Sequence, residues 1–223
     1  MPDPRLILAI EVSNPSASDS AAPGVALARW NPFEPIDSES LRGEGRQDDD
    51  LMPAIDRLCA RRAVEPRDIG VVALSIGPGG FTGLRVAAVT AKMLALTTGA
   101  DVVAIPSAEV AVETDPTAGR VGVLLATKRD QAWLALFENG VATEAGPATP
   151  EELSRISLDE LRADAALPDT YRRAVHCPIR PLRLDPIACA RLATIRNPTD
   201  PLAISPIYGR EPEAVRRWRE LHG

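Results

Sequence analysis

The chain has 223 residues, a formal net charge of -6 and a hydrophobic content of 45%, which is enough for one large core or two small ones. The acidic balance argues against a broad phosphate-binding face, because affinity for nucleic acid rests largely on clustered Lys and Arg. The apolar runs are strand-sized and far short of the roughly 20 residues of a membrane span. The N-terminal residues lack the pattern of a signal peptide, so we expect a cytoplasmic protein.

The sulfur and imidazole side chains do not predict a metal site or a disulfide framework. Cys59, Cys177 and Cys189 are odd in number, widely separated and never spaced as C-x-x-C. His176 and His222 do not form an H-E-x-x-H or H-x-x-x-H pair. We therefore expect buried free thiols, no metal and no cofactor.

The first segments read as strands and an amphipathic helix. Continuous apolar runs at 6–10 and 24–28 predict two strands, and a weaker strand candidate lies at 36–41. Leu51, Ile55 and Leu58 have helical spacing, and acidic residues 48–50 suit the positive N-terminus of that helix.

An alternation of strand and helix follows. Thr82 can cap the second helix through its hydroxyl, and Gly99 stands where a left-handed C-terminal residue is wanted. The expected elements are a strand at 71–76, a helix at 83–98, a strand at 101–106 and a short helix at 107–110. This order predicts an α/β fold with a partly parallel sheet.

A new set of elements begins near residue 121, so a domain boundary is expected between 114 and 120. The predicted elements are strands at 121–125 and 133–137, a helix from Thr149-Pro150 with Glu152 completing a capping box, a helix at 187–195, a strand-like segment at 201–208 and a closing helix at 212–221. We divide the chain into a first domain of residues 1–115, completed by 209–223, and a smaller second domain of residues 116–208.

The segment 77–83 is rich in glycine and lies between a strand and a helix, where phosphate often binds. Its glycines fall at 77, 79, 80 and 83, which matches neither G-x-x-x-x-G-K-[ST] nor G-x-G-x-x-G. A tight turn that lets the helix approach the sheet closely explains the glycines equally well.

One stripe of the second helix is dominated by small side chains. It consists of Leu84, Ala87, Ala88, Ala91, Leu94 and Ala95. Such a stripe permits close approach of another backbone. From the residues alone, packing on the chain's own sheet and contact with another molecule both remain open.

The segment 75–85 resembles the signature of a known protein family. The signature Gly77, Pro78, Gly79, Gly80, Phe81, Thr82, Gly83 and Arg85, with Ser75, Ile76 and Leu84, closely resembles that of the TsaB proteins, also called YeaZ-like or glycoprotease-like. Segments 8–13, 103–107 and 206–212 resemble the family's opening strand, the strand after the signature helix and the closing segment.

The resemblance implies a fold of two related actin-like or sugar-kinase-like (ASKHA) domains, with the last helix packing back on the first domain. It also implies a non-catalytic partner in threonylcarbamoylation of tRNA adenosine (t6A). The family's partners are the catalytic subunit TsaD and the ATPase TsaE, with tRNA reached only through the complex. We further expect a homodimer when the protein is alone. The expected partner interface is Leu51, Ile55, Leu58, Leu84, Ala87, Ala88, Ala91, Leu94 and Ala95.

The chain departs from the family's pattern at three places. Glu11-Val12-Ser13 replaces Asp-Thr-Ser, residues 48–50 stand where the first helix usually has a His nearby, and 127–130 replace an Asp-Ala-Arg-like sequence.

The alternative function is an autonomous ATP-binding or ATP-hydrolysing enzyme of this fold. Glu11 is the one acid in place for Mg²⁺, and the following loop 14–23 lacks glycine and lysine, so we expect no catalytic residues. A protease would need a histidine pair or a nucleophile with a base, and neither is found.

Overall fold

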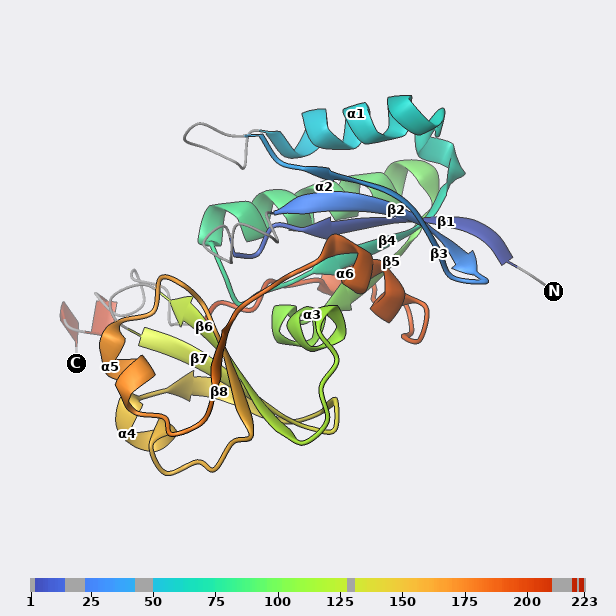
Figure 1. Cartoon of the computed structure of the whole chain (residues 1–223). Coiled ribbons are helices and arrows are strands. Elements are labelled where there is room, and N and C mark those ends of the chain that lie inside the picture. The colour runs from blue at the N-terminus through green and yellow to red at the C-terminus, as the bar shows by residue number, and fades with distance from the viewer. Residues whose placement is uncertain are drawn as a thin grey trace.

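The computed structural model describes residues 3–14, 23–42, 50–127, 131–209, 218–219 and 221–222. The first half of the chain forms a five-stranded sheet in the order β3-β2-β1-β4-β5 (Figure 1). Its strands are β1 (Asp3–Glu11), β2 (Gly24–Asn31), β3 (Glu34–Ser40), β4 (Ile69–Ser75) and β5 (Asp101–Ile105). β1 to β3 are antiparallel, whereas β4 and β5 run parallel to β1.

The second half repeats this topology. The order of its sheet is β10-β9-β6-β7-β8, with β6 to β8 antiparallel and β9 and β10 parallel to β6. Its strands are β6 (Arg120–Thr127), β7 (Gln131–Glu138), β8 (Val141–Ala148), β9 (Glu160–Ala163) and β10 (Ile179–Pro181). The two halves are therefore structural duplicates, as the resemblance to two related actin-like domains implies, although the sequence shows no repeat.

Two long helices cover one face of the first sheet. α1 (Leu51–Arg62) and α2 (Phe81–Thr98) share a core with the strand residues that point toward them, among them Leu8 and Ile10. Since successive side chains of a strand point to opposite faces, Ile7 and Ala9 lie in a different core on the other side.

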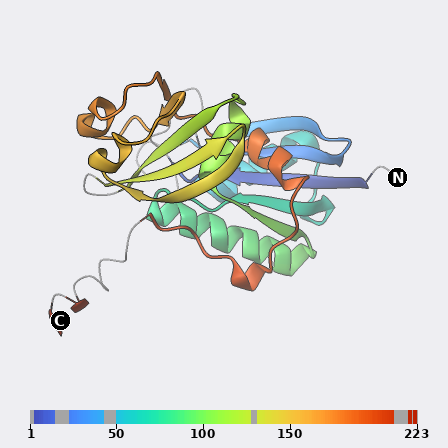
Figure 2. The same cartoon turned by 90° about the horizontal axis from the view of Figure 1, so that it is seen from below.

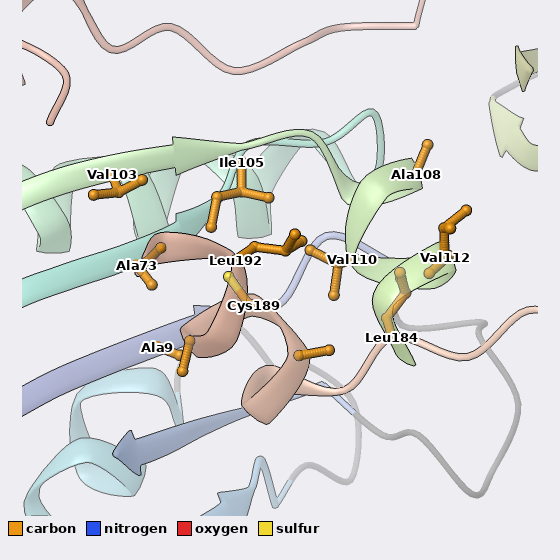
Figure 3. Packing of buried hydrophobic residues seen from close by; sticks show 14 of the residues in the cluster. Ala9, Ala73, Val103, Ile105, Ala108, Val110, Val112, Leu184, Cys189 and Leu192 are labelled. Atoms are coloured by element: carbon orange, nitrogen blue, oxygen red, sulfur yellow. The ribbon is translucent and has the colours of Figure 1, made fainter. Parts of the chain in front are cut away.

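That second core joins the two halves. α6 (Pro186–Ala193) follows the second sheet in the chain but packs on β1 and β2, while α3 (Ser107–Thr114) follows the first sheet and packs on β6. Figure 3 shows Cys189 and Leu192 of α6 among side chains from β4, β5 and α3. Each half thus contributes a helix to the other, and the apolar core runs between the two sheets without a break.

The chain then returns to the first half. Residues 194–209 run from α6 back past β5 and α2 to the loop that precedes α2 (Figure 2). Thr199 N donates to Val102 O at 2.7 Å, Ile204 is buried in the first-half core, and Ile207 N donates to Ile76 O at 2.8 Å. The expected closing helix at 212–221 lies largely outside the described residues.

Several sequence predictions need correction. α2 begins at Phe81 with Gly80 as its N-cap, so Thr82 lies inside the helix and does not cap it. The segment 201–208 is a 3-10 turn (Pro201–Ala203) and irregular chain, because it packs across α2 and joins neither sheet. Gly99 does close α2 in the left-handed region, with φ 77°. The strands β8, β9 and β10 and the helix α5 (Asp169–Arg173) were not predicted, and α4 (Pro150–Leu153) is a single turn.

A buried arginine fixes α3 to the second sheet. Arg162 on β9 is 2% exposed and donates from Nε to Glu160 and from Nη1 to the carbonyl of Ala111 at 2.8 Å. Its Nη2 donates to the carbonyl of Asp115 and to the Thr117 hydroxyl. One side chain therefore donates to two carbonyls at the C-terminal end of α3, where carbonyls lack partners within the helix.

Arg162→Ala should lower the free energy of unfolding by about 3 kcal/mol, because Glu160 and two α3 carbonyls lose a buried donor. Urea denaturation measures the loss. Arg180→Ala is the matched control, since Arg180 also pairs with Glu160 but its side chain is 63% exposed, and it should lower stability by less than about 1 kcal/mol. Equal losses in the two variants would contradict this role.

Candidate functional site

The signature loop 77–80 lies directly on the end of β1. Gly80 N donates to the carbonyl of Ser13 at 2.7 Å, and the loop carbonyl of Gly77 accepts from Ser107 N at 2.9 Å. Ile207 of the returning segment pairs with Ile76, next to the loop. The loop is therefore held by the first strand, by α3 and by the C-terminal segment together.

This packing explains two of the glycines. Gly77 has φ +96°, a region that side chains other than glycine rarely adopt. A Cβ on Gly79 would lie 1.7 Å from the carbonyl oxygen of Ser13, which is a backbone atom and cannot turn away. The structure therefore supports the interpretation of a tight turn and close approach, and the amide of Gly80 is already used inside the protein.

Gly79→Ala should destabilise the fold by more than about 3 kcal/mol, because the loop and β1 would have to separate. Gly146→Ala is the matched control: Gly146 has open space where a Cβ would stand and no positive φ, so its change should stay within about 0.5 kcal/mol. Thermal and urea melts compare the two. A fully stable Gly79→Ala protein would contradict the contact.

Glu11, the acid proposed from the sequence as a possible Mg²⁺ ligand, is enclosed at the end of β1. It is 1% exposed. Its Oε1 accepts from Ser13 N at 2.8 Å and from the Ser13 hydroxyl at 2.5 Å. Among the described residues, Oε2 has no hydrogen-bond partner. Burial raises the pKa of Glu11 above its usual value, and the hydrogen bonds from Ser13 oppose this rise only in part.

Because the pKa of Glu11 is raised in the folded state, the direction in which its contribution to stability changes with pH can be predicted. Protonated Glu11 stabilises the fold fully below its unfolded pKa, near 4.5, and this stabilisation is lost as pH rises through the folded pKa. Glu11→Gln cannot ionise. The stability of wild type relative to Glu11→Gln should therefore fall as pH rises from about 4 to about 8.

Urea melts of both proteins across that range measure this difference. A difference that stays constant over the range, or that grows with pH, would contradict a raised pKa.

The two halves meet beside Glu11. Asn14, just past β1, donates from Nδ2 to Asp164 Oδ2 at 2.6 Å, and Asp164 directly follows β9 of the second sheet. Both side chains are buried. Asp164 also accepts from Ala126 N at 3.2 Å and Ala166 N at 2.9 Å. The strand ends that face each other across the two halves are thus bonded to one another.

Arg85 and Phe81, from the signature, join the returning chain to α2. The Arg85 guanidinium lies 3.9 Å over the Phe81 ring, and its Nε donates to the Tyr208 hydroxyl at 3.2 Å. The Phe81 and Tyr208 rings are 5.1 Å apart. The sequence placed all three in family segments, and the structure brings them together at the first turn of α2.

The small-residue stripe of α2 is part of the protein's own core. The buried members of the expected interface are Leu51, Ile55, Leu58, Leu84, Ala87, Ala88, Ala91 and Ala95, and Leu94 is partly buried. The structure contradicts the expectation that this stripe is open to a second helix, because the small side chains let α2 pack closely on β4. That the region of α1 and α2 forms an association surface stays a prediction.

Other residues of α2 face outward. Val89, Met93 and Leu96 are 60%, 54% and 68% exposed and lie at helical spacing on one side; we call them the α2 face. On α1, Met52 is 53% exposed. Sequence reasoning missed the α2 face because α2 is apolar on both sides, so its periodicity does not distinguish inside from outside.

Within the described ranges, no group of three or more His, Cys, Asp or Glu side chains could hold a metal ion. No helix in the same part of the chain is long and apolar enough to cross a membrane. All three cysteines are free, with Cys59 and Cys189 buried and Cys177 partly buried.

Comparison with known proteins gives a match to one family model and a match of the fold. The model of the family "TsaD: tRNA N6-adenosine threonylcarbamoyltransferase" matches residues 47–157, which include α1, the signature loop and α2. A comparison with curated proteins gives no match. A crystal structure of an uncharacterized protein with similarity to peptidase YEAZ from Pseudomonas aeruginosa has a TM-score of 0.73 at 18% identity, over 92% of this chain and 100% of that one.

A second solved structure, YeaZ from Pseudomonas aeruginosa, has a TM-score of 0.70 at 18% identity and covers 92% of this chain and 99% of the other. The resemblance stated from the signature is therefore confirmed, and the fold is the α/β fold of these YeaZ structures, with two sheets of the same topology.

Proposed function

We propose that this chain is a non-catalytic partner subunit in the formation of t6A on tRNA, and that it binds a TsaD-type catalytic subunit. The observation that carries the proposal is the combination of the match to the TsaD family model over 47–157 with a YeaZ-like fold over almost the whole chain. We also propose that the protein works with a TsaE-type ATPase and that it forms a homodimer when no partner is present.

The geometry around β1 supports a role without chemistry of its own. A carboxylate that holds Mg²⁺ must be ionised and must reach the metal. Glu11 is buried, with its pKa raised and Oε1 already hydrogen-bonded to Ser13. The glycine-rich loop is packed against the Ser13 carbonyl, which leaves its Gly80 amide committed to the protein.

The outward sides of α1 and α2 are the surface that we assign to the partner. The α2 face and Met52 are apolar and more than half exposed, and both helices cover the same face of the first sheet. The three side chains of the α2 face lie on one side of the helix, and exposed apolar groups that lie together mark interaction surfaces. The family model covers both helices.

Val89→Glu should weaken association with the catalytic subunit from the same organism by at least about tenfold, which corresponds to about 1.4 kcal/mol. Size-exclusion chromatography of the co-expressed proteins, followed by titration calorimetry, gives the measurement. The variant should stay folded because Val89 is exposed. Ala91→Glu, in contrast, should unfold the protein, since it buries an unpaired charge in the core.

Val141→Glu is the matched control: Val141 is a 67% exposed valine on β8 of the second half, and its replacement should leave association unchanged. If the wild-type proteins elute separately, the partner role fails. ATP hydrolysis by the purified chain that disappears in Glu11→Ala would favour the autonomous enzyme instead.

A further inference from the structure

The methionines have an unusual placement in this protein. The sequence has three, of which Met52 and Met93 lie within the described residues. Methionine is among the residue types most often fully buried, yet both of these side chains are more than half exposed. The described thioethers of the protein are therefore open to water.

Both methionines stand on the surface that we assign to the partner. Met93 lies in the middle of the α2 face, four residues after Val89 and three before Leu96, so the three share one side of the helix. Met52 lies in the first turn of α1, which covers the same face of the first sheet. A change in either thioether would alter this surface and leave the core intact.

The thiols are placed in the opposite way. Cys59 and Cys189 are buried and Cys177 is partly buried, and burial raises the pKa of all three above the usual thiol value. Because the thiolate is the reactive form, these cysteines are held in their less reactive state. Thioether oxidation requires no ionisation, so peroxide should reach Met52 and Met93 before the thiols.

We propose that oxidation of Met93 and Met52, each exposed on its own helix of this surface, controls association with the catalytic subunit, an inference that rests on the proposed function. The oxidant is a peroxide. The thioether sulfur attacks one peroxide oxygen, an S–O bond forms as the O–O bond breaks, and water leaves. Sulfur loses two electrons, and the peroxide is reduced to water. A reductase of methionine sulfoxide reverses the step.

The sulfoxide changes the chemistry of the surface at its centre. A flexible apolar side chain becomes polar, with a strong acceptor oxygen that water satisfies in the free protein. In the complex that oxygen would be buried against an apolar partner surface without a donor. Oxidation should therefore leave the free protein folded and weaken the complex.

The experiment compares wild type, Met93→Leu, Met52→Leu and the double variant before and after hydrogen peroxide. Each protein is compared with its own untreated form, so any change in basal affinity cancels. Peptide mass spectrometry locates the added oxygen, circular dichroism follows folding, and calorimetry gives the affinity for the catalytic subunit. Oxidised wild type should bind at least tenfold more weakly, the single variants should lose less, and the double variant should keep the affinity of its untreated form.

A protection assay tests the same site independently. In the preformed complex, oxidation at Met93 should be several-fold slower than in the free chain. Full oxidation of both methionines without loss of affinity would overturn this inference but not the proposed function. The same holds if the oxidised double variant loses as much affinity as oxidised wild type, if oxidised wild type unfolds, or if the cysteines are oxidised first. If the untreated proteins do not associate, the proposed function fails, and this inference fails with it.

Discussion

The contact between the backbone of Gly79 and Gly80 and the carbonyl of Ser13 determines much of this structure. It leaves no room for a Cβ at residue 79, so the strand end and the loop must close together. Because α2 begins at Phe81, directly after the loop, the contact also fixes where α2 starts on the sheet. The small side chains that face inward then let α2 lie close to β4, and the larger apolar ones are left outside.

The two halves have the same sheet topology, but the corresponding helices are much shorter in the second half. α1 and α2 have 12 and 18 residues, whereas their counterparts α4 and α5 have 4 and 5. Helices this short end before a second turn is complete and present no continuous face. An extended helical surface is therefore present on the first half, while the short helices of the second half offer none.

Much of the fold could be predicted, because its signals are local. Thr149 caps the helix that it was expected to begin, and Gly99 ends α2 as expected. β8 was missed because its residues are exposed on both sides at a sheet edge, so they do not alternate. β9 was missed because Glu160 and Arg162 are buried as a pair, which reads in sequence as a surface segment. Which apolar side of α2 faces the core depends on tertiary packing, and the helical periodicity of the sequence does not indicate it.

The size of the α2 face sets a requirement on any partner. Full burial of a Val, Leu or Met side chain is worth about 1.5 to 3 kcal/mol, and these three start little more than half exposed. Together they supply roughly 3 to 6 kcal/mol, while association has to overcome an estimated 4 to 15 kcal/mol of lost freedom. The α2 face alone therefore does not account for a stable complex. A partner that binds here must also reach α1, where Met52 is the exposed apolar side chain in the first turn, and must complete the interface with polar contacts around both helices.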